Sequence, residues 1–467
     1  MQPTLPLWAA RDYQLRAVKM LLQNGAAGLL LYPGMGKTSI VLESFRILKE
    51  KNLIDKLFVV GPLRVISSAW PQELAKWSNF SGLTHSIIHG GRDKRKKALA
   101  ANADVYLMNV EGILTEFNDA FAKWVDGAGR VMLVLDESTL FKNSGSRRFK
   151  IIKKFLNLFY KRYILTGTPM PKSIENLFGQ IFLLDQGASL GRYITHFRQE
   201  YMTLKYDGSW EPMHSALPRI AERIAPFTLQ LDANEYLTLP EVVTLDHWVT
   251  LPVRAMHSYK ELEREFIAEL DGATIVAPNA AAALTKLRQV AGGAVYVPTT
   301  KDWVHVHRAK LDALTGILEE LDGAPMLLFY HYDHERIRIQ EAFPGTPAIR
   351  GGCSIEEANI QIAMFNAGHL PLLLVHPASM AHGVNLQEGH AQHVCWFGLF
   401  YDREQYDQAN ARVARSGNKS SHVFVHRILA TGSVDGVMSK VLECRGNFQE
   451  AFCRLIREQE GMEYECE

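Results

Sequence analysis

The first residues that could do chemistry form a glycine-containing loop after an apolar run. Residues 28–32 are mostly apolar and lead into Pro33, Gly34, Met35, Gly36, Lys37 and Thr38. Glycines let main-chain N–H groups approach a phosphate closely, and a helix that begins near Lys37 turns its positive dipole end toward the same place. Lys37 would reach the β- and γ-phosphates, and Thr38 would ligate Mg2+. The segment therefore predicts a nucleoside triphosphate site, with an ordinary loop and helix cap as the alternative, because the full motif has glycine where this chain has Leu31.

Two adjacent carboxylates follow a second apolar run. Residues 131–135 are all apolar, as in a strand buried on both faces, and Asp136 and Glu137 come directly after them. At the carboxyl end of such a strand, Asp136 can hold Mg2+ through water and Glu137 can orient the water that attacks the γ-phosphate. Solvated charges at a strand end are the alternative. Asp136 follows Lys37 by about 100 residues, which fits one doubly wound domain and favours the catalytic interpretation.

Composition restricts the class of protein. The chain has 467 residues, of which 47% are hydrophobic, and this is enough for two domains with separate cores. Its 51 basic and 50 acidic residues give a net charge of +1, so binding of nucleic acid would need a local basic groove. The five cysteines contain no Cys-x-x-Cys pair, and they indicate neither a disulfide framework nor a zinc site. We find no signal peptide and no apolar run near the roughly 20 residues of a membrane helix, so we expect a cytoplasmic protein without a membrane partner.

Apolar runs alternate with helical periodicity at both ends of the chain. The first part predicts helices at 12–23, after 37 and at 67–77, and strands at 28–32, 57–61, 104–109, 131–135 and 162–166. Helical periodicity takes over after about residue 185, and the alternation returns from 307, with strands at 325–330, 371–376, 393–397 and 421–427 and helices at 333–343 and 403–415. This rhythm predicts an α/β fold of two parallel-sheet lobes with a helical insertion region between them. We expect the domains to be 1–185, 186–300 and 301–440, with a C-terminal helical brace at 441–467.

The second lobe supplies arginines that could act on a phosphate. Gln408, Arg412 and Arg415 are four and three residues apart, so on one helix all three would project from one face. An arginine fork suits the charge that spreads over the γ-phosphate oxygens in the transition state. A solvent-exposed basic helix is the alternative.

In their order along the chain, these segments resemble the motifs of the Swi/Snf-like branch of the superfamily 2 helicases and translocases. Residues 11–14 resemble the adenine-recognising segment, 33–38 motif I, 59–63 with 70–77 motif Ia, 136–143 the Asp-Glu-Ala-His box and 165–169 motif III. Residues 326–330, 364–366 with 379–386, and 408–418 are similar to motifs IV, V and VI. The resemblance covers nearly the whole chain. It implies two RecA-like lobes and ATP hydrolysis with Mg2+, coupled to movement along nucleic acid. The compact core looks most like phage-type members, which implies a bacterial or phage-infected host cytoplasm and a role in DNA replication or recombination.

The resemblance also assigns roles to residues of this chain. Catalysis is assigned to Lys37, Asp136, Glu137, Arg412 and Arg415, and the metal to Thr38 and Asp136. Nucleotide binding is assigned to Tyr13, Gln14, Pro33, Gly34, Met35, Gly36, Lys37, Thr38 and Gln408. Contacts with nucleic-acid phosphates are assigned to Pro62, Arg64, Thr168, Ser379 and Asn385, with Lys142 and Asn143 behind them, and coupling of the two activities to Thr139, Thr166 and Thr168.

The chain departs from the family pattern at three places. Thr139 stands where the box has His, motif V reads Met380-Ala381 instead of Gly-Gly, and motif VI ends in Arg415-Ser416-Gly417-Asn418 instead of Arg-x-Gly-Gln. Thr139 brings coupling, rather than hydrolysis itself, into question. Three functions therefore stay open: a translocase on mostly double-stranded DNA, a helicase that unwinds forks or single strands, and a nucleotide-gated DNA-binding scaffold. We expect duplex or forked DNA as the partner in preference to RNA, and a monomer suffices because the arginines come from the same chain.

Overall fold

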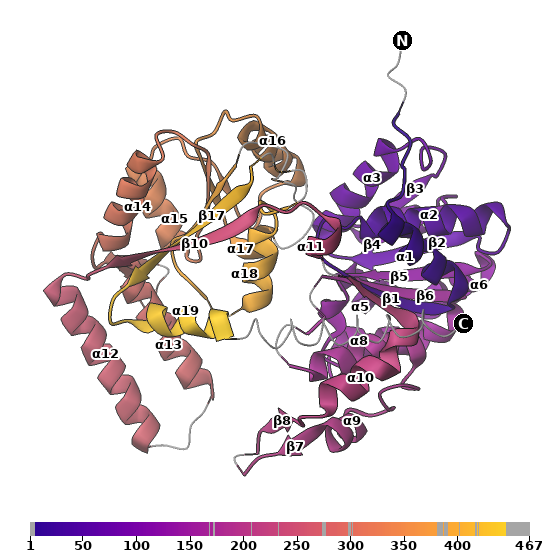
Figure 1. Cartoon of the computed structure of the whole chain (residues 1–467), viewed down its shortest axis with the longest axis horizontal. Helices are drawn as coiled ribbons and strands as arrows, with labels where there is room; N and C mark the ends of the chain where they lie inside the picture. Colours follow the sequence, from indigo (N-terminus) through magenta and orange to yellow (C-terminus); the bar gives the residue numbers. More distant parts are fainter. Residues whose placement is uncertain are drawn as a thin grey trace. The chain divides into compact units, whose positions relative to one another are not determined.

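A computed structural model describes residues 5–444, apart from 168, 171–172, 207, 232, 273–276, 298–299, 301, 381–385, 387–390, 401, 416–417 and 419. Two compact units divide the chain at Leu237 and Thr238. Each unit has a parallel sheet with helices packed around it (Figure 1). The predicted α/β class with two parallel-sheet lobes is thus confirmed.

The first unit is built on a seven-stranded sheet in the order β3-β4-β2-β5-β6-β1-β9. Its strands are β1 (Ala26–Leu31), β2 (Lys56–Gly61), β3 (His85–Ile88), β4 (Val105–Asn109), β5 (Val131–Asp136), β6 (Lys161–Thr166) and β9 (Thr228–Leu231). All neighbouring strands pair in parallel. The central strands are continuous apolar runs because helices cover both faces of such a sheet. Since the strands are parallel, their carboxyl ends share one edge.

Among the helices of the first unit, those expected at 12–23 and after 37 are present, and the one expected at 67–77 differs locally. They are α1 (Asp12–Gln23), α2 (Lys37–Glu50), α3 (Trp70–Lys76), α4 (Arg92–Ala100), α5 (Ile113–Glu116), α6 (Asp119–Gly127), α7 (Arg147–Ile152), α8 (Glu175–Asp185), α9 (Ile194–Tyr201), α10 (Ala216–Ile224) and α11 (Ala233–Tyr236). The helix expected at 67–77 is a π-helical turn, η1 (Val65–Ala69), that continues into α3. A hairpin of β7 (Met202–Leu204) and β8 (Trp210–Pro212) extends away from the sheet beside α9 (Figure 1).

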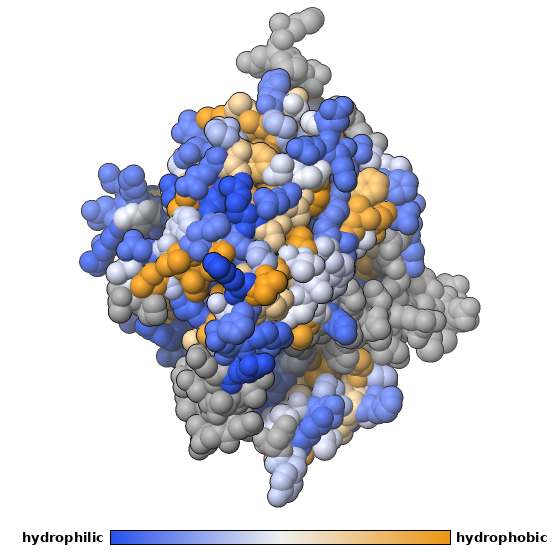
Figure 2. All heavy atoms as spheres, turned by 90° about the vertical axis from the view of Figure 1, so that its left-hand side faces the viewer, coloured by the Kyte–Doolittle hydropathy of each residue, from blue (hydrophilic) through white to orange (hydrophobic). Residues whose placement is uncertain are grey.

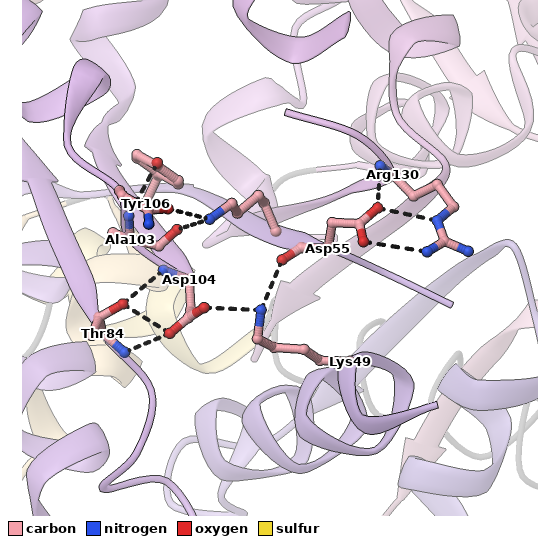
Figure 3. A network of polar contacts seen from close by, with 9 residues as sticks. Lys49, Asp55, Thr84, Ala103, Asp104, Tyr106 and Arg130 are labelled. Atoms are coloured by element: carbon pink, nitrogen blue, oxygen red, sulfur yellow. Dashed lines mark hydrogen bonds and ion pairs between the residues drawn. The ribbon is translucent and has the colours of Figure 1, made fainter. Parts of the chain in front are cut away.

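A polar network joins the amino ends of the strands of the first unit (Figure 3). Asp55, just before β2, accepts hydrogen bonds from the backbone N–H and the guanidinium of Arg130, just before β5, at 2.8 and 3.1 Å. Asp104, just before β4, pairs with Lys49 of α2 at 2.9 Å and accepts the N–H and hydroxyl of Thr84 at 2.8 Å each. These contacts lock the ends of neighbouring strands together. They lie at the edge opposite to the one that carries the predicted catalytic residues.

The second unit has a six-stranded parallel sheet in the order β10-β17-β16-β13-β15-β14. The strands are β10 (Glu241–Val249), β13 (Met326–Phe329), β14 (Ala348–Ile349), β15 (Leu372–Val375), β16 (His393–Trp396) and β17 (His422–Ala430), and a separate hairpin pairs β11 (Ala294–Tyr296) with β12 (Trp303–His305). The helices are α12 (Val253–Gly272), α13 (Ala277–Gly292), α14 (Ala309–Glu320), α15 (Asp333–Ala342), α16 (Ile355–Asn366), α17 (Pro377–Met380), α18 (Arg403–Asn410) and α19 (Val434–Cys444).

The stretch 186–300 is not purely helical. Within it, β9 extends the first sheet beside β1, whereas β10 forms the edge of the second sheet beside β17. Both strands therefore belong to sheets formed mainly by distant segments. None of the described helices has both the length and the apolar character needed to cross a membrane.

Candidate nucleotide and nucleic-acid site

Strand register brings the predicted catalytic segments to one edge of the first sheet. β6 lies between β5 and β1, with Leu30 of β1 opposite Thr166 and Leu165 opposite Asp136. The loop after β1, the carboxylates after β5 and the threonine that ends β6 therefore lie at the same level. The carboxyl edge of a parallel sheet is where ligands bind in α/β proteins.

The loop between β1 and α2 has the backbone geometry of a phosphate cradle. Gly34 and Gly36 have φ of 96° and 78°, in the left-handed region that favours glycine. Gly36 caps α2, which begins at Lys37, and Thr38 stands in its first turn. The Lys37 ammonium donates to the carbonyls of Leu31 and Tyr32, at 2.6 and 3.4 Å. Its charge thus lies directly beside the loop that would hold the phosphates.

The segment before α1 supports this loop. Tyr13 Oη and Gln14 Nε2 both donate to the carbonyl of Met35, at 3.2 Å each. Gln14 Oε1 accepts the backbone N–H of Arg11 at 3.0 Å, so both ends of the amide are bonded. Burial raises the pKa of Tyr13. The Tyr13 ring also lies 5.2 Å from that of Tyr236 in α11, a neighbour for which the sequence carried no signal.

Asp136 is held by a tryptophan from a distant segment. Trp70, fully buried at the start of α3, donates its indole N–H to Asp136 Oδ2 at 2.9 Å. Burial raises the pKa of Asp136, and this hydrogen bond acts in the opposite direction. Although Trp70 lies in the motif Ia segment, its spacing does not reveal this contact.

Glu137 lies between two threonine hydroxyls. Its backbone is left-handed, with φ of 57°, which is unusual for a residue other than glycine and turns the chain sharply after β5. Thr139 Oγ1 donates to Glu137 Oε1 at 3.0 Å, and Thr166 Oγ1 lies at 3.5 Å from the same oxygen. Thr139 is 2% exposed and Thr166 is fully buried. Two of the predicted coupling residues therefore contact the predicted catalytic carboxylate directly.

The residues that would hold Mg2+ suit that ion. Mg2+ in nucleotide sites is bound by one or two protein oxygens, with phosphate oxygens and waters completing an octahedron. The Thr38 hydroxyl and the Asp136 carboxylate are oxygen donors of this kind. In the part of the chain that the structure describes, no cluster of three or more His, Cys, Asp or Glu side chains is arranged to hold a metal. A metal here would therefore depend on the nucleotide for most of its ligands.

Of the nucleic-acid candidates, three lie among the described residues. Pro62 is buried directly after β2, where its carbonyl accepts the N–H of Ile66 at 3.1 Å, and Arg64 is half-buried before η1. Ser379 is half-buried in α17 of the second unit. Thr168 and Asn385 lie outside the described residues. Behind the box, Lys142 is half-buried and Asn143 is exposed.

The arginines of the second unit do not share a helix face, which corrects the predicted helix at 403–415. Helix α18 ends at Asn410, and the chain continues in tight turns in which Arg412 N–H bonds Ala409 O at 3.1 Å and Arg415 N–H bonds Val413 O at 2.8 Å. Asn410 accepts the indole N–H of Trp396 at 3.0 Å. Gln408 is therefore a buried helical residue, whereas Arg412 and Arg415 are half-buried turn residues.

On the face drawn in Figure 2, hydrophobic residues form several separate patches among hydrophilic ones. Scattered exposed apolar residues are usual on folded proteins. The candidate site therefore rests on the polar residues at the sheet edge.

Family models match both units. The SNF2-related domain matches residues 13–291, and the helicase conserved C-terminal domain matches residues 309–417. Together they cover the segments from Tyr13 and Gln14 to Arg415.

Individual proteins are also similar to this chain. Protein p41 of Acyrthosiphon pisum secondary endosymbiont phage 1 is 32% identical over 96% of this chain and 98% of its own length. Mouse chromodomain-helicase-DNA-binding protein 1-like is 23% identical over 94% of this chain, but this chain spans only 50% of that protein. Among solved structures, the Sulfolobus solfataricus SWI2/SNF2 ATPase core in complex with dsDNA is 20% identical, covers 98% of this chain and 96% of its own, and has a TM-score of 0.44.

Proposed function

This chain belongs to the SNF2-related family and is a nucleic-acid-dependent ATPase, and from that premise we propose that it uses ATP hydrolysis to move along double-stranded DNA. One observation carries the proposal. The phosphate loop, Asp136 and a Glu137 bonded to Thr139 lie at one edge of one sheet. Motif III begins at the end of β6, which lies at the same edge, so a contact with DNA there can act on the catalytic carboxylate.

The hydrolytic step follows from the side chains of the first unit. Backbone N–H groups around Gly34 and Gly36 bind the β- and γ-phosphates, and Lys37 leaves its carbonyl partners to neutralise them. Asp136 and Thr38 would hold Mg2+, and the ion would supply positive charge against the phosphate oxygens. Glu137 then orients a water and accepts its proton as the water attacks the γ-phosphate, whose bond to the bridging oxygen breaks so that ADP leaves.

The remaining assignments concern the nucleic acid and the second unit. Arg412 and Arg415 stabilise the charge on the γ-phosphate oxygens during transfer. Pro62, Arg64, Thr168, Ser379 and Asn385 contact DNA phosphates, which carry no sequence information. The near-zero net charge agrees with a confined binding groove rather than a strong positive field over the whole surface. The domain division at 1–185, 186–300, 301–440 and 441–467 stays part of this proposal.

Steady-state ATPase measurements test the proposal. Wild type and Glu137→Gln are compared without nucleic acid and with single-stranded DNA, blunt duplex, forked DNA or RNA. We expect strong stimulation of the wild type by blunt duplex and loss of turnover in Glu137→Gln by about 100-fold or more, because the general base is removed. Glu222→Gln, an exposed carboxylate of α10, serves as the matched control and should behave as wild type.

The other two functions are outcomes of the same experiment. Stimulation mainly by forks or single strands would favour a helicase that unwinds DNA. No stimulation of the ATPase by any nucleic acid would contradict movement along DNA and favour a nucleotide-gated scaffold. In a scaffold, Lys37→Ala would abolish the effect of the nucleotide and leave the binding of DNA or of a partner intact. Movement itself is tested by displacement of a third, triplex-forming strand from blunt duplex, because this does not require the two strands of the duplex to separate.

A further inference from the structure

Gln180 of α8 is a buried polar side chain whose carboxamide is bonded at both ends. It is 1% exposed. Its Oε1 accepts the Ser138 hydroxyl at 2.7 Å, and its Nε2 donates to the carbonyls of Pro169 and Asn176, each at 2.7 Å. Asn176 lies on the same helix. The bonds to Ser138 and Pro169 are therefore the ones that join α8 to other segments.

Those two segments carry the predicted chemistry. Ser138 directly follows Glu137, and Pro169 directly follows Thr168, the candidate DNA contact of motif III. One carboxamide therefore links the neighbour of the catalytic carboxylate to the neighbour of a DNA contact. The path from Ser138 to Pro169 thus runs through the Gln180 side chain alone.

Helix α8 is packed too closely on this region to move independently. A Cβ on Gly179 would lie 2.4 Å from the carbonyl oxygen of Phe141 and 3.1 Å from that of Lys142, so the helix backbone lies directly against the turn Ser138–Phe141. Leu177, in the same helix, is fully buried in the core of the first unit. Close packing transmits displacement instead of absorbing it.

We propose that Gln180 is a positioning residue that transmits DNA binding at motif III to Glu137; this inference rests on the proposed DNA-dependent ATPase function. A displacement of Pro169 pulls on the Gln180 amide, which moves Ser138 and thereby the carboxylate of Glu137. Breaking either bond would leave a buried polar group without a partner, so the two segments move together. A carboxamide suits this position because it accepts at one end and donates at the other.

The test uses Ser138→Ala, Gln180→Met and the double variant. For each, kcat and the KM for ATP are measured with and without blunt duplex DNA, together with the Tm. In each single variant, kcat and KM without DNA should stay within about twofold of the wild-type values. The stimulation of kcat by duplex DNA should fall about tenfold, which is the effect expected when one buried hydrogen bond is removed.

The double variant separates positioning from stability. It leaves neither the Ser138 hydroxyl nor the Gln180 amide unpaired, and only the Pro169 carbonyl loses its donor, so its Tm should lie above that of Gln180→Met while stimulation by duplex stays low. Leu177→Val is the matched control, since it weakens the packing of α8 and lowers the Tm without changing the carboxamide; its stimulation should equal that of wild type.

Three results would overturn the inference. The first is full stimulation in both single variants, and the second is stimulation that recovers with the Tm in the double variant. The third is an equal loss of stimulation in Leu177→Val. In all three cases duplex DNA still stimulates the wild-type ATPase, so only this inference is contradicted. If duplex DNA does not stimulate the wild type, the proposed function fails, and this inference fails with it.

Discussion

Substitution of Gly36 by Ala tests the geometry of the phosphate loop. Gly36 has φ of 78° and ψ of 31°, and a Cβ at this position would lie 2.5 Å from Gln14 Nε2. The left-handed conformation costs an L-residue about 1–2 kcal/mol. Gln14 must also move away, which breaks its hydrogen bonds with Met35 and Arg11, each worth about 1 kcal/mol. We expect Gly36→Ala to lower the free energy of unfolding of the first unit by about 3 kcal/mol.

The assay combines thermal denaturation with titration of a fluorescent ATP analogue. A unit of this size should lose about 2–4 °C in Tm for each kcal/mol. ATP affinity should fall by at least about tenfold, because the strained loop turns its N–H groups away from the phosphates and the candidate base contact Gln14 is displaced. Gly25→Ala is the matched control. Gly25 directly precedes β1, the strand that leads into the phosphate loop, and a Cβ there would meet nothing within 4 Å.

A double-mutant cycle with Gln14→Ala then isolates the clash. Both single substitutions remove the same two hydrogen bonds, so the double variant should be about 2 kcal/mol more stable than additivity predicts. The reasoning is refuted if Gly36→Ala unfolds within about 0.5 kcal/mol of wild type with unchanged ATP affinity, or if the two substitutions are additive.

Three further predictions concern buried charge. Burial raises the pKa of Asp136, so its pKa in the folded state exceeds that in the unfolded state, and its ionisation lowers stability as pH rises through that range. Asp136→Asn should therefore raise the Tm of the nucleotide-free protein at about pH 8 and abolish Mg2+-dependent ATPase. Equal Tm values for the variant and wild type from about pH 4 to 8 would contradict this. Lys310 and Asp435 form an ion pair at 2.6 Å with side chains 1% and 3% exposed, so Lys310→Met should destabilise the second unit by about 3–5 kcal/mol in urea, whereas Lys310→Met with Asp435→Asn should recover most of the loss. Burial lowers the pKa of His334 from 6.5 to about 4, so wild type loses stability as pH falls through this window, while His334→Phe should show a flatter Tm profile; parallel profiles would exclude His334 as a source of acid lability.

Local patterns in the sequence were sufficient for the central strands of both sheets, but not for the edge strands β3, β9 and β10. The apolar runs before Gly34 and Asp136 mark buried parallel strands, because a strand covered on both faces excludes polar side chains. The loop that would hold the phosphates is six consecutive residues, so its chemistry is visible without a fold. Periodicity failed at the end of α18. Helical spacing continues through Arg415, yet the helix ends at Asn410, whose side chain accepts a hydrogen bond from the distant Trp396.

Only the tertiary structure decided which side chains support the candidate catalytic residues. Trp70 bonds Asp136 across 66 residues and Gln180 bonds Ser138 across 42, and β10 joins a strand that follows it by about 180 residues. Periodicity shows that a residue is buried but does not identify its partner. That choice depends on the order of strands in the sheet and on which helix packs over which turn, and these are set by the packing of the whole unit rather than by any segment alone.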